Sequence, residues 1–496
     1  MSPTLPRLSG ALLPTLSPAV TWLPGYDRSS VSVGIVHVGL GAFHRAHQAV
    51  FTDDRLAAGE VAWGICGLSL RSPATSRALQ PQDGLYTVLE RGPEGDRARV
   101  VGAVLEALTV PEAPDTAMAR LTDPRTRIVS LTVTEKGYCQ DAATGTLDEA
   151  HPDVVHDLEH GDRLQRSVPG LLVEAFRRRR AAGAPPCTVL TCDNLPSNGA
   201  TVARIVSRYA ALRDPHLAAY IAGEIAFPST MVDRIVPATR DEDRAAVEAA
   251  CGYRDAWPVV AEPFTQWVIE DRFASGRPRW EEAGVLMVRD VRPFELMKLR
   301  ALNGAHSALA YLGSVAGIGT VAEAMAEPAL ALFLRRLWDE DLIPTLPPVP
   351  GVDPSRYTAA LEDRFRNPAI RHRLGQIAMD GSQKLPQRLL APALDRLCRG
   401  AVPDHIAVVV AAWMRFLLGR DEQGGACLVQ DPLAEQLLGV ARRNGGNAAA
   451  LSAALFAMPQ IFDPALAAHP GFRGSVQDAL HSMLTRGVRA TLANQT

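Results

Sequence analysis

The residues best suited to chemistry lie in one apolar stretch, FELMKLRALNGAHSALAYLG (294–313). On an α-helix, with about 100° between successive residues, His306 lies about 80° and Asn303 about 140° from Lys298, so all three share less than half of the circumference. Burying such groups is costly unless they serve one another or a ligand. A desolvated lysine can act as a general base, and an amide can polarise a substrate oxygen. A lysine that only reaches out to solvent is the alternative.

Three further clusters of polar residues follow apolar, strand-like runs. Each cluster alone is typical of a structural ion pair or of a turn. Because parallel α/β sheets bind ligands beyond the carboxyl ends of their strands, the three together predict a functional site. The clusters are Glu135 and Lys136 in TVTEKGYC (132–139), Asp193 and Asn194 in TCDNLPSNG (191–199), and Asp233 and Arg234 in FPSTMVDRIVPAT (227–239).

The stretch VGIVHVGLGAFHRAHQAVFTDDRL (33–56) places two glycines directly after an apolar run. Gly39 and Gly41 permit a tight turn, in which backbone N–H groups can approach a pyrophosphate at a helix N-terminus. The third glycine of the usual pattern is missing, since His44 occupies its place. The predicted dinucleotide-binding residues of this turn are Gly39, Leu40, Gly41, Ala42, Phe43 and His44.

His44 and His47 stand three positions apart on the helix expected after these glycines, a spacing that can bind zinc. A closed zinc site also needs thiolates or carboxylates, and the sequence places none clearly beside them. We favour the interpretation that these histidines hydrogen-bond locally or line the nucleotide pocket. We therefore expect no bound metal.

The two halves of the chain differ in pattern. Up to about residue 290, β-branched runs alternate with helical stretches, which is typical of a mostly parallel sheet, and GLYTVLERG with ARVVGAVLEAL resembles an inserted hairpin. From about Pro293, long Ala/Leu-rich segments predict helices. The sequence thus predicts an α/β fold class, with a nucleotide-binding domain over 1–290, a mainly α-helical domain over 291–496 and a cleft between them. The expected helical segments are 294–315, 320–340, 355–380, 404–419, 431–457 and 474–492.

Bulk composition excludes several classes of partner. The 51 basic and 54 acidic residues give a formal charge of −3, which provides no general attraction to nucleic acid or to an anionic membrane. The apolar run IAVVVAAWM (406–414) is shorter than the roughly twenty residues of a membrane crossing, so it predicts a buried helix. Seven cysteines without a CxxC pair, and no recognisable signal peptide, favour the cytoplasm. We expect a monomer or a weak oligomer.

Six segments, in this order, resemble the polyol-specific long-chain dehydrogenase family, which includes mannitol 2-dehydrogenases and fructuronate reductases. They are GLGAFHRAHQAVFTDD, SLTVTEKGYC, CDNLPSNG, FPSTMVDRIVPAT, EPFTQWVIEDRF and ELMKLRALNGAHSALAYLG. The resemblance implies a Rossmann-type first domain, a helical second domain, a nicotinamide cofactor and catalysis without metal. It also implies roles for single residues: Lys298 as general acid/base, Asn194 and Asn303 as a clamp on the reacting oxygen, His306 in positioning the substrate, Glu135 in proton traffic, and Asp233 and Lys384 in the substrate pocket.

Two departures from the mannitol-oxidising members of that family favour a sugar acid. Lys136 stands where those members have a glycine, and Gln376 stands where they have an arginine, eight positions before Lys384. Both, together with MDGSQKLPQRLL and its Arg388, resemble fructuronate reductases. Lys136 offers a cation for the carboxylate that a neutral polyol lacks. Solvated surface charge is the alternative interpretation of Lys384 and Arg388.

We therefore expect an oxidoreductase that interconverts D-mannonate and D-fructuronate. The alternative within the same class is a mannitol 2-dehydrogenase or a D-arabinitol dehydrogenase. From other classes come a zinc-dependent hydrolase and a non-catalytic nucleotide-binding regulator. The cofactor expected from the family is NAD, but SLRSPATSR (69–77), after the second strand, has no carboxylate for a ribose and carries Arg71 and Arg77 instead. We predict that Arg71 contacts the cofactor, and NADP stays open.

Overall fold

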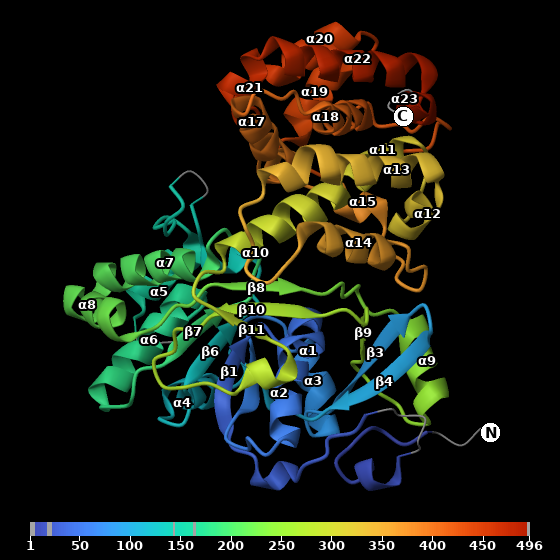
Figure 1. The fold of residues 1–496 in the computed structure, drawn as a ribbon. Helices are drawn as coiled ribbons and strands as arrows, with labels where there is room; N and C mark the ends of the chain where they lie inside the picture. The colour runs from blue at the N-terminus through green and yellow to red at the C-terminus, as the bar shows by residue number, and fades with distance from the viewer. Residues whose placement is uncertain (1–4, 17–21, 142–143, 162–164, 494–496) are drawn as a thin grey trace. The chain divides into compact units, whose positions relative to one another are not determined.

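The computed structural model describes residues 5–16, 22–141, 144–161 and 165–493. The chain divides into two compact units, Met1–Val291 and Arg292–Thr496. The first is a Rossmann-type α/β unit built on a parallel sheet, and the second is helical (Figure 1). The predicted fold class is confirmed.

Five parallel strands form the central sheet of the α/β unit. Their order is β5-β2-β1-β6-β7, so the first strand of the chain lies in the middle. Sheets of this kind bind ligands at the carboxyl ends of the strands where the strand order reverses, which is here between β1 and β6. The strands are β1 (Val33–Val38), β2 (Gly64–Ser69), β5 (Val104–Thr109), β6 (Ile128–Leu131) and β7 (Thr188–Thr191).

Helices cover both faces of this sheet, because its strands are almost entirely buried and need apolar cover on each side. One apolar core includes residues of α4, α6 and α7, and the other includes residues of α2 and of the added strands. The helices of the unit are α1 (Ala42–Ala46), α2 (Gln48–Ala57), α3 (Ala74–Leu79), α4 (Pro114–Thr122), α5 (Pro152–Glu159), α6 (Val168–Ala181), α7 (Asn198–Arg213), α8 (Pro215–Glu224) and α9 (Asp241–Cys251).

Two three-stranded sheets are added to the unit. β3 (Tyr86–Gly92) and β4 (Gly95–Val101) form the expected hairpin. The expected continuation of that hairpin is wrong, because Val104–Thr109 pairs with β2 as the edge strand of the main sheet. Alternating apolar residues suit both pairings, so the sequence pattern could not distinguish them. The remaining added strands are β8 (Thr230–Asp233), β9 (Val259–Ala261), β10 (Gln266–Glu270) and β11 (Leu286–Val288).

The described residues of the second unit form helices and no strand. The expected buried helix lies within α18 (Asp404–Phe416), which packs against α11 and α22. The other helices are α10 (Arg292–Met297), α11 (Gly304–Val315), α12 (Val321–Ala326), α13 (Pro328–Arg336), α14 (Pro354–Phe365), α15 (Leu374–Ile377), α16 (Gly381–Leu385), α17 (Ala391–Cys398), α19 (Ala434–Asn444), α20 (Ala448–Phe456), α21 (Pro464–Ala468), α22 (Pro470–Arg486) and α23 (Val488–Ala493).

Four of the expected helical segments are interrupted. The segment expected over 320–340 is divided at Glu327, which is extended before Pro328, and the segment expected over 474–492 is divided at Gly487, whose φ is +86°. The segment expected over 355–380 stops at Phe365, because Pro368 cannot continue a helix and disfavours helical backbone at the residue before it. The segment expected over 431–457 is split where Gly445 and Gly446 separate α19 from α20. After the break at Phe365, residues 366–373 form a non-helical connection that carries His372.

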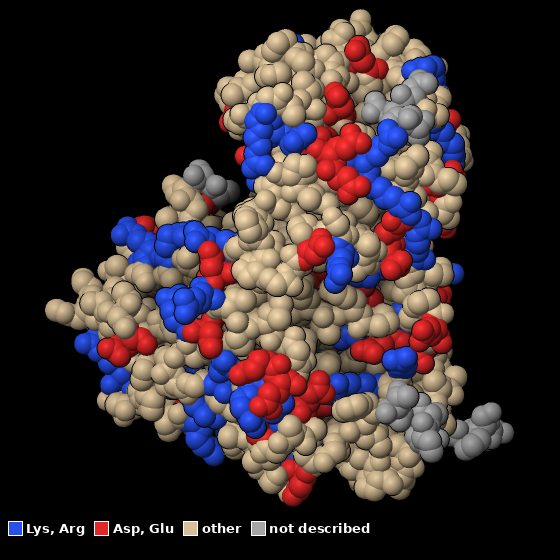
Figure 2. All heavy atoms as spheres, viewed as in Figure 1, with Lys and Arg blue, Asp and Glu red and all other residues tan. Residues whose placement is uncertain are grey.

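Acidic and basic side chains are interspersed on the face shown in Figure 2, with no field of a single sign. This distribution agrees with the nearly balanced charge of the chain. Within the described ranges, none of the helices combines the length and the apolar character that a membrane crossing requires.

Candidate active site

β1 ends in a tight turn at Gly39, whose φ of +98° lies in the left-handed region. A Cβ atom at this position would stand 2.0 Å from the carbonyl oxygen of Thr132, which follows β6, so only glycine fits. The Gly39 carbonyl accepts hydrogen bonds from Thr132 Oγ1 (2.8 Å) and from the Gly41 N–H (2.6 Å). The turn is therefore anchored to the end of β6, where the strand order reverses.

Gly41 is a glycine for a different reason. Its φ of −84° suits any residue, and a Cβ atom here would meet no atom closer than 3.7 Å. The residue is exposed and is the N-cap of α1. Because the fold does not require glycine at this position, the missing side chain leaves backbone open to a group approaching from outside, as a pyrophosphate does.

Two stacked histidine rings lie beside this turn. His37 on β1 and His44 on α1 are buried, with ring centroids 3.4 Å apart and planes inclined by 13°. Burial lowers the pKa of His37 to about 3 and holds the pKa of His44 well below its ordinary value. His37 forms hydrogen bonds with Ser130 Oγ (2.8 Å) and with the Gly39 carbonyl (3.1 Å). Both rings are therefore neutral, and the pair packs against the turn through the contact between His37 and the Gly39 carbonyl.

The expectation that His44 and His47 lie on one helix is wrong. α1 ends at Ala46 and α2 begins at Gln48, and His47 between them has non-helical backbone angles (φ −127°, ψ −88°). His47 Nε2 forms a hydrogen bond with the carbonyl of Gln266 (2.8 Å). Among the described residues, no three or more His, Cys, Asp or Glu side chains are grouped so that they could hold a metal ion.

A carboxylate from the neighbouring strand holds the turn after β6. Asp193, which follows β7, accepts hydrogen bonds from the N–H groups of Val133 (2.9 Å) and Thr134 (3.1 Å) and from the hydroxyl of Tyr138 (2.7 Å). Thr134 has a φ of +66° and a ψ of 163°, a conformation that costs a β-branched residue about 1–3 kcal/mol. Strain of this kind persists mainly at functional sites.

The residues directly after this strained position are Glu135 and Lys136, which begin a 3-10 turn. The side chain of Glu135 lies outside the described part of the chain. Lys136 is exposed just beyond the end of β6. An exposed amine at this edge of the sheet can meet the charged end of a ligand.

Asn194, the predicted oxygen clamp of this unit, is exposed in the bend after β7. Nearby lies the buried Asn198, which sequence reasoning missed. Its Nδ2 donates to the carbonyls of Asp193 and Thr230 (3.0 Å each), and its Oδ1 accepts from the Thr230 N–H (2.9 Å). Asn198 therefore ties the bend to β8 and fixes the backbone that carries Asn194.

The cluster at the end of β8 divides into two side chains with different surroundings. Asp233 is the buried last residue of β8. The guanidinium of Arg234 donates to the carbonyls of Glu262 and Ala46 and to the carboxylate of Glu90. Arg234 is therefore a structural cation. Asp233 lies at the carboxyl end of β8, where the sequence predicted a site residue.

The arginines after β2 both have carboxylate partners. Arg71 is exposed and lies 2.9 Å from Asp153, and Arg77 lies 2.5 Å from Glu112. Exposed ion pairs of this kind contribute about 0–1 kcal/mol, so a phosphate can replace either carboxylate at small cost.

In the helical unit, Lys298, Asn303 and His306 lie on one continuous helix whose middle is wider than an α-helix. Lys298–Asn303 form a π turn between α10 and α11, and the N–H of Gly304 donates to the carbonyl of Leu299, five residues back. A turn closed by such bonds holds more residues than an α-helical turn, so Lys298 and Asn303 lie closer in direction than the roughly 140° expected for an α-helix. Lys298 and His306 are buried.

Two side chains from other helical segments hold the π turn. The indole Nε1–H of Trp338 donates to the carbonyl of Ala301 (2.8 Å). Arg388, predicted as a substrate ligand, donates to the carbonyl of Asn303 (3.4 Å) and to Ser307 Oγ (3.2 Å). Both contacts stabilise backbone geometry that an isolated helix would not adopt.

His306 is packed among aromatic rings. Its ring lies 4.6 Å from that of Phe365 and 5.0 Å from that of His372, which meets it edge-on at 86°. Burial, followed by the positive field of neighbouring groups, holds the pKa of His306 well below its ordinary value. The cations that contribute to this field are Arg388, Arg364 and Lys298. Sequence reasoning missed His372, because a histidine between two arginines resembles solvated surface.

The two remaining predicted substrate ligands lie on short helices of the same unit. Gln376 is exposed on α15. Lys384 is half-buried on α16, where its Nζ donates to the carbonyl of Ile377 (3.4 Å) and lies 3.8 Å from a carboxylate oxygen of Asp380. Lys384 is therefore oriented along the connection between these two helices.

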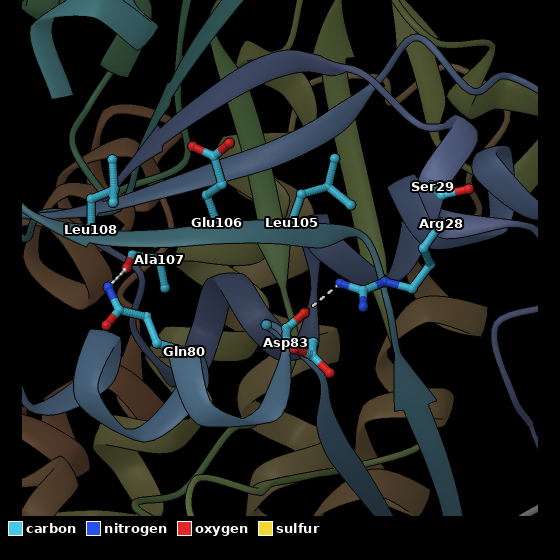
Figure 3. A pocket seen from close by; sticks show the side chains of 9 residues that line it. Arg28, Ser29, Gln80, Asp83, Leu105, Glu106, Ala107 and Leu108 are labelled. Atoms are coloured by element: carbon cyan, nitrogen blue, oxygen red, sulfur yellow. Dashed lines mark hydrogen bonds between the residues drawn. The ribbon is translucent and has the colours of Figure 1, made fainter. Parts of the chain in front are cut away.

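A cavity of about 510 Å³ lies along the outer edge of β5, away from the strand ends that carry the predicted site. Figure 3 shows how side chains already use its polar groups: Arg28 Nη2 donates to the Asp83 carbonyl (2.6 Å) and Gln80 Nε2 to the Ala107 carbonyl (2.9 Å). These contacts protect an exposed sheet edge. The cavity offers no set of unmatched groups that would favour an active site.

Comparison with known proteins identifies the family. Residues 33–282 match the mannitol dehydrogenase Rossmann domain, and residues 290–484 match the mannitol dehydrogenase C-terminal domain. The chain belongs to the mannitol dehydrogenase family. It is a dehydrogenase of this family, and the predicted resemblance is confirmed at that level.

Members of this family resemble the chain over nearly its whole length. Two proteins of Escherichia coli K12 are each 44% identical to it: the uncharacterized oxidoreductase YeiQ over 475 residues (95% of this chain, 96% of that protein) and D-mannonate oxidoreductase over 479 residues (95% and 97%). The solved mannitol 2-dehydrogenase of Pseudomonas fluorescens, a ternary complex with NAD and D-mannitol, has a TM-score of 0.87 and 39% identity, with 99% of each chain covered.

In this dehydrogenase the candidate residues form two groups, one in each unit. At the carboxyl ends of adjacent strands, the α/β unit brings together the turn at Gly39, the strained turn before Lys136 and the bend at Asn194. The helical unit brings together Lys298, Asn303 and His306, with Arg388 and His372 beside them.

Proposed function

We propose that this member of the mannitol dehydrogenase family interconverts D-mannonate and D-fructuronate, with NAD(H) as the hydride carrier. The observation that carries the proposal is the positive field around His306, to which Arg388, Arg364 and Lys298 contribute. A sugar acid brings a carboxylate that such a field attracts, whereas a polyol brings none. The 44% identity to D-mannonate oxidoreductase supports the same substrate.

The turn from Gly39 to His44 fits a dinucleotide. Gly41 leaves backbone open where the fold itself would accept a side chain, and backbone N–H groups at a helix start suit a pyrophosphate. NAD is proposed because the Pseudomonas fluorescens relative was solved with NAD. Arg71 replaces the usual carboxylate beyond β2, so NADP is the alternative cofactor.

Bound nicotinamide would accept hydride from the carbinol carbon during oxidation and return it during reduction. In oxidation, the amine of Lys298 accepts the hydroxyl proton as hydride leaves the same carbon, so that a ketone forms. In reduction, the ammonium of Lys298 returns that proton to the oxygen. The side-chain amide of Asn303, close to Lys298 on the π turn, donates to the oxygen while negative charge develops on it.

The remaining predicted residues have supporting roles in this scheme. Asn194 is proposed as the second amide donor, and Glu135 as the group through which the proton exchanges with solvent. Asp233 and Lys384 would contact substrate hydroxyls, and Gln376 is proposed as a further residue of the substrate pocket. For Arg388, the contact with the Asn303 carbonyl adds support of the π turn to the predicted role in binding.

A panel of aldonates and polyols, each assayed with NAD and with NADP, tests the proposal through the absorbance of the reduced nicotinamide. The expected result is a higher kcat/KM for D-mannonate oxidation and D-fructuronate reduction than for the mannitol and arabinitol reactions. Preference for mannitol would instead make the chain a mannitol 2-dehydrogenase. Titration of NADH and NADPH by protein fluorescence decides the cofactor.

The Lys136→Gly variant isolates the proposed contact with the carboxylate. We expect the KM for D-mannonate to rise about tenfold, because an exposed charge-assisted contact is lost, while activity on mannitol is unchanged. An equal loss of activity on D-mannonate and on mannitol would show that Lys136 does not recognise the carboxylate.

We place the protein in the cytoplasm, because all seven cysteines are thiols and structural disulfides form in oxidising compartments.

A zinc-dependent hydrolase has no support from the separated His44 and His47. A chelator is expected to leave dehydrogenase activity unchanged.

A further inference from the structure

His372 lies in the stretch between α14 and α15 and faces the candidate catalytic helix. Its ring meets that of His306 edge-on at 5.0 Å. His372 Nδ1 and His306 Nε2 are both buried, and neither has a hydrogen-bond partner among the described residues. Buried polar atoms are nearly always matched in folded proteins, so two unmatched nitrogens at one place indicate a partner that is not part of the chain.

The backbone around His372 is fixed by contacts with the segment before α12. The His372 carbonyl accepts from the N–H of Val321 (3.0 Å), and its own N–H donates to the carbonyl of Ile370 (2.8 Å). Thr320 and Arg373 form an antiparallel bridge next to this contact. The backbone that carries the ring is therefore fixed beside His306 by these contacts.

The chemistry of the missing partner follows from the charge state of the two rings. Burial lowers the pKa of His372 to about 4, and the pKa of His306 lies well below its ordinary value. Both rings are therefore neutral near pH 7, and each offers one donor and one acceptor nitrogen. A hydroxyl group can donate or accept, so it suits an imidazole nitrogen in either tautomer.

We propose that His372 is a specificity-determining residue which, together with His306, binds hydroxyl groups on neighbouring carbons of the substrate chain. The centroids of the two rings lie only 5.0 Å apart, and hydroxyls on adjacent carbons lie close enough together for one to meet each ring. The inference rests on the proposed function, because it requires a polyhydroxylated substrate. The reacting oxygen is left to Lys298 and Asn303.

Steady-state kinetics of His372→Ala and His372→Asn measure this role. In His372→Ala we expect the KM for the sugar substrate to rise about tenfold, with kcat within about twofold of the wild type and NADH affinity unchanged. The amide of His372→Asn can still donate and accept hydrogen bonds, so this variant should recover part of the loss. A purely structural role would lower kcat or NADH affinity in both variants, and that result overturns the proposal.

Monodeoxy analogues of the best substrate give the sharper test. For the wild type, removal of the hydroxyl that His372 binds lowers kcat/KM. For His372→Ala, the same analogue and the full substrate should have equal kcat/KM, because the partner of that hydroxyl is already gone. Removal of the other hydroxyls should affect both proteins equally. If no analogue behaves in this way, His372 does not bind a hydroxyl.

The control is His481→Ala, which removes an exposed imidazole from α22 of the same unit and should leave all constants unchanged. The two proposals fail in different ways. If the wild type turns over no sugar acid or polyol, the proposed function is wrong and the hydroxyl-binding role falls with it. If the wild type is active and His372→Ala has the same KM, only the role of His372 is wrong.

Discussion

The strand ends of the α/β unit and the lysine-bearing helix of the second unit differ in whether their polar side chains have hydrogen-bond partners within the protein. At the strand ends, Asp193 and Asn198 match their hydrogen-bonding groups with neighbouring backbone and so fix the loops. In the second unit, His306 Nε2 on the helix and His372 Nδ1 beside it are buried without hydrogen-bond partners among the described residues.

This difference corresponds to the two ligands that a dehydrogenase binds. A dinucleotide has invariant phosphates, and a rigid turn with open backbone is sufficient for it. Sugar substrates differ in single hydroxyls, and a site that leaves polar side chains unmatched discriminates strongly among them. The rigid turn at Gly39 suits the invariant part of a dinucleotide, and the unmatched nitrogens of His306 and His372 suit a ligand that is distinguished by its hydroxyls.

Removal of the proposed general base should have the largest effect on activity. In Lys298→Ala we expect kcat to fall by about 10²–10⁴, because no other group is proposed to take the hydroxyl proton. NADH affinity, measured by fluorescence titration, should stay within about twofold, since the dinucleotide turn belongs to the other unit. Near-normal turnover would contradict the assignment of Lys298.

The two glycines of the turn separate folding from cofactor binding. Gly39→Ala places a Cβ 2.0 Å from the Thr132 carbonyl oxygen at a positive φ, so it should lower the free energy of unfolding by about 3 kcal/mol. Gly41→Ala meets no close atom and should keep the wild-type Tm while weakening NADH about tenfold. Equal NADH affinity in Gly41→Ala would show that this backbone does not approach the cofactor.

The π turn can be perturbed without touching a proposed substrate ligand. Trp338→Phe keeps a buried aromatic ring and removes the Nε1–H that donates to the Ala301 carbonyl. We expect kcat to fall about tenfold with a smaller change in KM, because the direction of Lys298 relative to Asn303 depends on this turn. An unchanged kcat would show that the turn persists without the indole donor.

An ion cluster around the buried Glu174, whose arginine partners reach the surface, should affect stability and leave activity unchanged. Burial of Glu174 on α6 acts to raise its pKa. Its contacts with Arg177, Arg178 and Arg213 act more strongly in the other direction, so the pKa is lowered to about 2. Because this pKa lies below the ordinary 4.5, the cluster stabilises the fold above pH 4.5 and loses its contribution as the pH falls toward 2.

Glu174→Gln should therefore lower the free energy of unfolding by about 2 kcal/mol at pH 7, measured by urea unfolding. The difference from the wild type should shrink at pH 3, and kcat at pH 7 should be unchanged. A kcat loss as large as that of Trp338→Phe would mean that distant packing in the α/β unit controls the reaction.

Some parts of the candidate site could be predicted from the sequence and others could not. The glycine turn and the polar strand ends were recognisable because strands, turns and their carboxyl ends leave local patterns of apolar, glycine and polar residues. The roles of Asn198 and Trp338 were not recognisable, because each acts through a backbone group distant in the sequence. His372 was missed because a histidine between two arginines resembles solvated surface and because its neighbour His306 is 66 positions away.

By itself, the sequence determined the alternation that makes a parallel sheet, the helical second half and the lysine, asparagine and histidine on one helix. Only the tertiary structure decided that Val104–Thr109 joins the main sheet, that α1 ends before His47 and that Lys298–Asn303 widen into a π turn. The physical reason is that hydrophobic periodicity is local. The choice between nearly equivalent backbone hydrogen bonds depends instead on side chains and strands contributed from elsewhere in the fold.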